Sequence, residues 1–217
     1  MASFEVTRVE DRPSWRGWIH AAAFLAAIPA GVMLILHAHR ASARVAASIY
    51  AASLLLGFGT SAAYHRMARS PRTQRIMQRL DHSMIFVLIA GTYTPVALLG
   101  MSAGWGIPVL CVVWTGAVAG VLIKQFAFDR LQILEYALYP ILGWVAIVAL
   151  PTMLVVMSGW ELGLVLAGGL LYTVGIPVLV RERPDPWPRT FGYHEIWHAF
   201  TLAAGVCHFA AVGMLVR

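Results

Sequence analysis

Charged residues are scarce in this sequence, since Asp, Glu, Lys and Arg together make up 12% of its 217 residues. Soluble domains carry about 25% charged and about 45–50% apolar residues. In this chain 59% of the residues are hydrophobic, so the composition excludes an ordinary soluble domain and indicates an integral membrane protein. The sequence also has no internal repeat and no low-complexity segment.

Cysteine is nearly absent, because Cys111 and Cys207 are the only two and both lie in apolar runs. Free cysteines behave as small apolar packing residues, so we expect neither a disulfide nor a cysteine metal site. A cleaved signal peptide is not expected either, since a mixed-charge segment precedes the first apolar run. We predict that this run stays in the chain as a membrane anchor.

Long apolar runs occur seven times, and each is near or above the roughly 17 residues that cross a bilayer. We therefore predict an all-α membrane protein, folded over residues 1–217 as a single seven-transmembrane helix bundle. The predicted spans cover residues 18–37, 45–65, 82–100, 107–124, 133–157, 162–180 and 193–216. Prolines predict bends in the third span, where Pro95 follows Tyr93, and in the fifth span, at Pro140 and Pro151.

Basic residues are distributed unequally between the two ends of these spans. Thirteen of the 16 lysines and arginines lie at the ends that share a side with the N-terminal segment, and the others are Arg40, Arg44 and Arg217. Because cytoplasmic loops are enriched in Lys and Arg, we predict a cytoplasmic N-terminus and an external C-terminus. The densest cluster runs from Arg66 to Arg79 and predicts a short interfacial helix beside anionic lipid headgroups. The net charge of +6 therefore requires no nucleic-acid partner.

The last span carries ionisable side chains where apolar ones are expected, namely His194, Glu195, His198 and His208. Such residues are costly within a membrane and are usually functional. Residues four apart share one face of a helix, so His194 and His198 can direct two imidazoles at one point. This pair would supply half of the ligand shell of a zinc ion.

The predicted topology brings further polar residues to the same depth. The second span ends, and the third and last spans begin, on the cytoplasmic side, so His65 and Asp81 should lie level with His194 and His198. Three histidines leave one position of a tetrahedral Zn²⁺ open for water, which is typical of catalytic zinc. Asp81 would accept a hydrogen bond from that water and act as general base. Ser61, one turn before His65, would orient the water or donate to an oxyanion.

Other residues of the third and last spans have smaller predicted roles. His82 is a candidate for supporting the ligands without binding the metal, and Tyr93 is a candidate for lining the cavity. Glu195 is expected to pair with an inner-loop arginine such as Arg189. His208 lies about 15 Å along the helix from His198, too far to share its metal. We expect it to be a buried hydrogen-bonding histidine or a gate deeper in the cavity.

Two alternatives remain for this set of residues. Each residue could be a separate interfacial group, with Asp81 favoured only by the dipole at a helix N-terminus, and with His37 and His39 as solvated residues of an outer loop. His194 to His198 also matches H-E-x-x-H, in which Glu195 would be the general base of an intramembrane metalloprotease. Against the protease, the motif lies on the last span and His65 is already available as a third histidine.

Three stretches of the chain resemble one known family. They are S-x-x-Y-H at Ser61–His65, D-H-S-x-I-F-x-L-I-A-G-T-Y-T-P at Asp81–Pro95, and H-E-I-W-H-x-F with a following H-F at His194–Phe209. They are similar to the haemolysin III family, the bacterial branch of the progestin and adiponectin receptor (PAQR) superfamily, which is related to the alkaline ceramidases. The resemblance covers nearly the whole chain.

The resemblance implies a seven-helix bundle in the bacterial inner (plasma) membrane, with Zn²⁺ on His65, His194 and His198, Asp81 on the zinc-bound water, and Ser61 beside it. Relatives are amide hydrolases on ceramide-like lipids, or receptors for which such an activity is suspected; haemolysis and membrane lipid homeostasis are proposed for the bacterial branch. We therefore expect a zinc-dependent hydrolase that takes a membrane lipid amide or ester as substrate. The alternatives are a non-enzymatic sensor or receptor braced by zinc and a pore-forming haemolysin.

Overall fold

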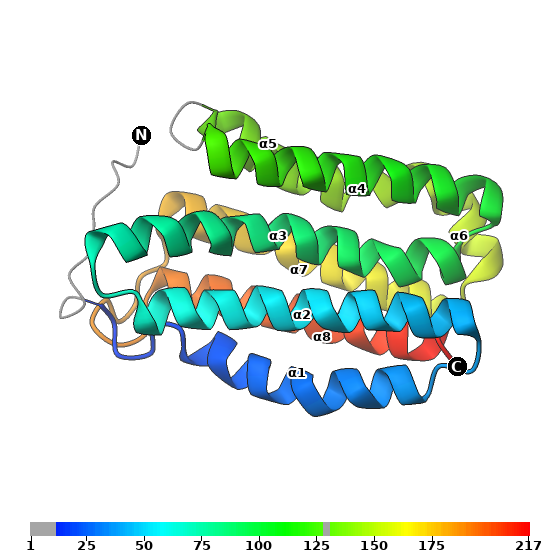
Figure 1. The fold of residues 1–217 in the computed structure, drawn as a ribbon, viewed down its shortest axis with the longest axis horizontal. Helices are drawn as coiled ribbons and strands as arrows, with labels where there is room; N and C mark the ends of the chain where they lie inside the picture. Colours follow the sequence, from blue (N-terminus) through cyan, green and yellow to red (C-terminus); the bar gives the residue numbers. More distant parts are fainter. Residues whose placement is uncertain (1–11, 128–130) are drawn as a thin grey trace.

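The computed structural model describes residues 12–127 and 131–217, and within it the side chains of residues 132–136 are not described. The described chain forms long helices that lie side by side in one bundle (Figure 1). Seven helices are long and apolar enough to cross a membrane, which confirms the predicted all-α seven-transmembrane fold. The helices are α1 (Trp18–Leu36), α2 (Ala41–Met67), α3 (Pro71–Gly100), α4 (Ala103–Phe126), α5 (Gln132–Gly143), η2 (Val145–Ala149), α6 (Leu150–Val156), α7 (Gly159–Arg181) and α8 (Tyr193–Leu215).

The fifth span is interrupted, as its prolines predict. It runs over Ala137–Val156 and is assembled from α5, the 3-10 helix η2 and α6. Tyr93 of α3 satisfies the backbone at the interruption, because its hydroxyl donates to Gly143 O and accepts from Ala146 N, each at 2.8 Å. Irregular backbone is tolerated at membrane depth only when protein groups satisfy it. Tyr93 therefore supports the broken helix.

Helix α3 begins at Pro71, well before the predicted start of the third span at residue 82. Ser70 caps it by accepting a hydrogen bond from Thr73 N at 3.1 Å, and proline is favoured at the first helical position. No helix breaker follows before residue 82. Three of the five clustered arginines, Arg72, Arg75 and Arg79, therefore lie on the first turns of a continuous membrane helix, and the prediction of a separate interfacial helix is wrong.

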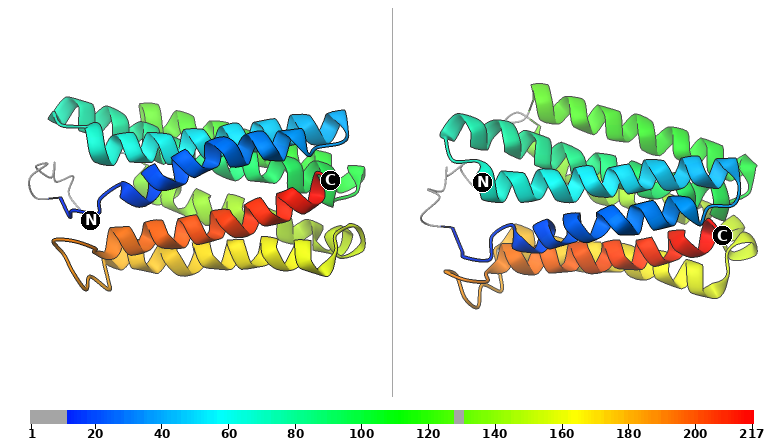
Figure 2. Two further views of the ribbon diagram at one scale, coloured as in Figure 1. Left: turned by 90° about the horizontal axis from the view of Figure 1, so that it is seen from below. Right: turned by 60° about the horizontal axis from the view of Figure 1, so that its bottom comes forward.

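The helices alternate in direction, so the ends of consecutive spans meet at the same end of the bundle. Figures 1 and 2 show the end of α2, the start of α3 and the start of α8 together at the end where α1 begins, with the C-terminus at the opposite end. This arrangement brings His65, Asp81 and the first turns of α8 to one level. Which membrane side each end faces stays a prediction, and two arginines of its charge count, Arg8 and Arg130, lie outside the described residues.

The interior of the bundle is built around α2 and α3. These helices bury small side chains such as Ala46, Ala47 and Ala90 completely, together with the large rings of Tyr50 and Phe86. Small residues allow membrane helices to approach closely, which increases their van der Waals contact. Both cysteines are free, as predicted. The core thus fixes α2 against α3 and holds the polar residues at their ends.

Candidate metal centre

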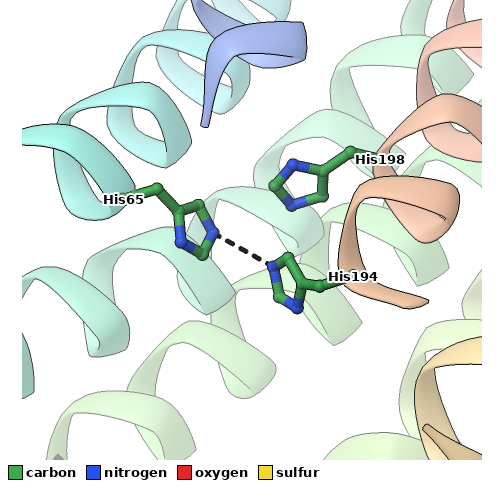
Figure 3. Close-up of side chains that lie close together, drawn as sticks. All are labelled: His65, His194 and His198. Carbon is green, nitrogen blue, oxygen red and sulfur yellow. Dashed lines mark hydrogen bonds between the residues drawn. The ribbon is translucent and has the colours of Figure 1, made fainter. Parts of the chain in front are cut away.

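Three histidines from two helices meet in a buried cluster at one end of the bundle. His65, His194 and His198 each offer a ring nitrogen, and these atoms all lie within 4.8 Å of one another. His65 Nε2 and His194 Nε2 are 3.2 Å apart, and Figure 3 shows the three imidazoles turned toward a common point. His65 is 7% exposed and His198 is 3% exposed. We call this group the three-histidine cluster.

The first turn of α8 is held in place by acidic side chains that accept hydrogen bonds from backbone N–H groups. Glu195 Oε2 accepts from Gly192 N at 2.9 Å, and Asp185 Oδ1 accepts from Tyr193 N at 3.0 Å. Acidic groups are favoured at this end of a helix, where backbone donors are unpaired. The first two turns carry His194 and His198 on one face, so the caps fix the level at which both imidazoles enter the cluster.

The donor set suits a tetrahedral metal ion, and the separation of one nitrogen pair is close to tetrahedral spacing. Zn–N bonds of about 2.0–2.1 Å at tetrahedral angles place two ligand nitrogens roughly 3.3–3.4 Å apart. The separation of 3.2 Å between His65 Nε2 and His194 Nε2 is close to this value. Among the residues that the structure describes, this is the one group of three or more His, Cys, Asp or Glu side chains placed to hold a metal ion. The cluster can therefore hold a metal ion, as the sequence predicts.

Asp81 lies beside the cluster, on the third turn of α3. Its Oδ2 is 4.0 Å from His65 Nε2, and 15% of its side chain is exposed. Ser61, one turn before His65 on α2, lies near the Asp81 carboxyl group. The structure thus brings Ser61 and Asp81 together at the level of the three histidines, and their catalytic roles stay predictions.

His20 of α1 is a neighbour of the cluster that the sequence analysis missed. Its Nδ1 is 2.8 Å from Ser61 Oγ and its Nε2 is 3.0 Å from Thr201 Oγ1. Its ring stacks on His198, with centroids 3.8 Å apart and planes 12° apart. The signal was present, because an ionisable residue inside a predicted membrane span is a candidate functional residue in its own right.

Glu195 has a different partner from the one predicted. Its Oε1 accepts from Arg16 Nε at 2.5 Å, so the expected pairing with Arg189 is wrong. The N-terminal segment reaches this position because Ser14 N and Trp15 N donate to the carbonyls of Arg189 and Thr190, each at 3.1 Å. Glu195 is 1% exposed and both of its oxygens are engaged. This geometry disfavours Glu195 as the general base of a metalloprotease.

Residues 12–17 form an N-terminal strap across the ends of α2 and α8. Arg12 donates to His65 O at 2.8 Å and to Ala68 O at 3.1 Å, which satisfies carbonyls at the end of α2. Burial lowers the pKa of the Arg12 guanidinium from its ordinary value. At Gly17 the backbone has φ +80°, and a Cβ would lie 2.7 Å from His65 Cβ. Glycine is therefore required where the strap passes His65.

The remaining predicted residues lie at the edge of the cluster or away from it. His82 precedes the buried Ser83 on α3, and its backbone carbonyl accepts from Tyr139 OH at 3.2 Å. His208 Nε2 is 3.1 Å from Val165 O, so this histidine joins α8 to α7, which favours the hydrogen-bonding interpretation over a gate. His37 is exposed, with Nδ1 2.7 Å from Met33 O.

Comparison with known proteins gives consistent matches over most of the chain. The family model described as "Haemolysin-III related" matches residues 10–209. The protein named "Hemolysin-3" from Bacillus cereus is 35% identical over 196 residues, which cover 89% of this chain and 86% of that protein. The "Hemolysin-3 homolog" of Bacillus subtilis (strain 168) is 33% identical over 196 residues, which cover 89% of each.

Proposed function

The chain belongs to the haemolysin III-related family, and from this membership and the three-histidine cluster we propose that it is a zinc-dependent hydrolase of membrane lipids. The proposed substrate is a lipid amide or ester, and the proposed location is the bacterial inner membrane. Its seven apolar helices and its family make it a multi-pass membrane protein. A contribution to membrane lipid homeostasis would follow from such a reaction.

The main support for the proposal is that the cluster offers three histidine ligands. His65, His194 and His198 would hold Zn²⁺ through three imidazole nitrogens. Three protein ligands are typical of catalytic zinc, whereas structural zinc usually has four. When bound, the metal would supply Lewis-acid chemistry and lower the pKa of water in the fourth position to about 7.

Asp81 and Ser61 would provide the proton chemistry. The Asp81 carboxylate, whose Oδ2 lies 4.0 Å from His65 Nε2, would take the proton of a water that attacks a carbonyl carbon. Ser61 is hydrogen-bonded to His20 and lies near Asp81, so it would orient the attacking water. A group held in this way loses little entropy when the substrate reacts, which lowers the barrier.

The arginines at the same end of the bundle suit a lipid with a polar headgroup. Arg66, Arg69, Arg72 and Arg75 are all exposed near the ends of α2 and α3. Met67 and Ile76, which are adjacent in sequence to Arg66 and Arg75, are exposed apolar side chains. Basic residues attract anionic headgroups by about 1 kcal/mol each near a membrane surface. They would hold the bilayer surface close to the level of the cluster.

Metal analysis and lipid turnover test the proposal together. Purified protein is expected to contain one zinc per chain, and His65→Ala is expected to lose it. Reconstituted protein is then incubated with a panel of ceramides, N-acyl amides and ester lipids, with Asp81→Ala as the matched inactive variant. The hydrolase proposal fails if zinc-replete protein turns over no lipid in the panel and Asp81→Ala leaves the cellular lipid composition unchanged.

A sensor or receptor braced by the metal is the second candidate, favoured by one observation. The cluster joins α2 to α8, and the N-terminal strap crosses the same two helix ends, so a bound ion would fasten these helices together. In that case Asp81→Asn would keep the function, whereas His194→Ala would lose both metal and stability. A pore-forming haemolysin, suggested by the names of the relatives, would instead release dye from liposomes, and would do so in the His65→Ala protein too.

A further inference from the structure

His20 lies outside the three-histidine cluster but contacts both of the helices that build it. It belongs to α1, is 7% exposed, and lies within the bundle. Its Nδ1 reaches Ser61 of α2 at 2.8 Å, and its Nε2 reaches Thr201 of α8 at 3.0 Å. Both ring nitrogens are therefore engaged with hydroxyl groups, and neither is directed at the cluster as a further ligand.

The two hydroxyl partners are placed close to the ligands themselves. Ser61 is one turn before His65 on α2, and Thr201 is three residues after His198 on α8, where its hydroxyl also donates to His198 O at 2.9 Å. A neutral imidazole has one donor nitrogen and one acceptor nitrogen, and hydroxyls can serve as either partner. Both hydrogen bonds can therefore form at once, so that His20 connects the two ligand-bearing helices.

The ring of His20 also controls the orientation of one ligand directly. It lies parallel to the His198 imidazole, with centroids 3.8 Å apart and planes 12° apart. The Phe58 ring also lies beside His20, with ring centroids 5.2 Å apart and planes 53° apart. Rotation of the His198 ring out of its plane would therefore collide with His20.

From these contacts we propose that His20 is a positioning residue of the metal centre. It fixes the spacing between α2 and α8 through Ser61 and Thr201, and it fixes the plane of His198 by stacking. This inference rests on the metal site of the proposed function, and is independent of whether that site hydrolyses lipids. Residues that orient metal ligands typically contribute about 10–100-fold to metal affinity.

Cobalt binding tests this role without an activity assay. Metal-free protein in detergent is titrated with Co²⁺, and the dissociation constant is measured by chelator competition while the d–d absorption bands report ligand geometry. His20→Ala is expected to weaken binding by about 10–100-fold and to change the bands. His208→Ala is the matched control, because it removes another histidine of low exposure from a membrane helix without touching the cluster, and it should bind like wild type.

Two further variants separate positioning from simple loss of packing. In His20→Gln the amide takes the place of Nε2, and in His20→Asn it takes the place of Nδ1, so each should restore part of the affinity and of the spectrum. Wild-type affinity and wild-type bands in His20→Ala would overturn the proposal. If His20→Ala does not fold, Thr201→Val tests the role instead, because it keeps the shape of Thr201 but removes the hydroxyl group to which His20 is hydrogen-bonded. Weaker Co²⁺ binding with altered bands in Thr201→Val supports the role, and unchanged binding overturns it.

The outcome for wild type separates this inference from the proposed function. Folded wild-type protein that binds no Co²⁺ would refute the metal centre, and His20 would then have no ligand to position. Wild-type binding that survives in His20→Ala refutes the role of His20 alone, and leaves the zinc hydrolase proposal as it stands.

Discussion

Removing the positive charge of Arg16 is expected to destabilise the protein far more than removing an exposed arginine. Arg16 pairs with Glu195 at 2.5 Å, and the two side chains are 19% and 1% exposed. Breaking a buried ion pair by removing one partner costs about 3–5 kcal/mol, because the other charge stays buried. Glu195 also accepts from Gly192 N, which compensates part of its charge, and Arg16 is partly solvated. We therefore expect Arg16→Met to lower the free energy of unfolding by about 2–3 kcal/mol.

A double-mutant cycle isolates this pair. Glu195→Gln removes the negative charge but keeps an oxygen for Gly192 N, so the double variant Arg16→Met with Glu195→Gln should recover most of the stability lost in Arg16→Met. Unfolding is followed by tryptophan fluorescence in an SDS titration. Arg66→Met is the control: Arg66 is exposed and its guanidinium lies 4.0 Å from the Trp18 ring centroid, a contact worth about 0.5–1 kcal/mol. Equal losses in Arg16→Met and Arg66→Met, with no coupling to Glu195, would refute the reasoning.

Three other perturbations test the metal centre and its surroundings. A strong chelator should lower the melting temperature of wild type, because an ion that binds the folded state stabilises it by mass action; differential scanning fluorimetry measures this, and the His65→Ala protein should not respond. Gly17→Ala should cost more than about 1 kcal/mol, since its left-handed backbone disfavours a side chain and its Cβ would meet His65, whereas Gly104→Ala, with no atom within 4 Å of its Cβ, should not destabilise. Tyr93→Phe should lower the free energy of unfolding by about 1–3 kcal/mol, because it leaves backbone groups of the fifth span without a hydrogen-bond partner. Its metal content, measured by mass spectrometry, should equal that of wild type.

Each of these expectations has a clear opposite. An identical melting curve with and without chelator would show that no ion contributes to stability. If Gly17→Ala were as stable as wild type, the strap would pass His65 less closely than in the structure, where a Cβ added at Gly17 would lie 2.7 Å from His65 Cβ. Loss of metal in Tyr93→Phe would connect the broken helix to the cluster, which the hydrogen bonds of Tyr93 to Gly143 and Ala146 do not suggest.

The architecture was predictable because apolar runs of membrane length have few alternatives to helices. Once the spans alternate in direction, His65 must come to the same end of the bundle as His194 and His198, although it is 129 positions from His194. The three-histidine cluster follows from topology and helix periodicity alone. The start of α3 was missed for a related reason, because its first turns carry arginines and a hydropathy pattern counts only the apolar part of a helix.

The details around the cluster depend on contacts that no local pattern encodes. His20 finds Ser61 and Thr201 at separations of 41 and 181 positions, and neither spacing has a periodic signature. The partner of Glu195 was predicted wrongly because the path of the N-terminal strap is set by backbone hydrogen bonds to residues 189 and 190. Side chains within one helix could be placed from the sequence, whereas contacts between distant segments required the structure.

The separation of the ligands along the chain has a consequence for biogenesis. His65 leaves the ribosome with α2, whereas His194 and His198 are made 129 and 133 positions later, in α8. An ion held by all three histidines can therefore be acquired only after α8 has been synthesised and has entered the bilayer. A chain truncated before α8 would lack two of the three ligands. Bound metal would therefore distinguish chains that contain α8 from truncated chains during quality control.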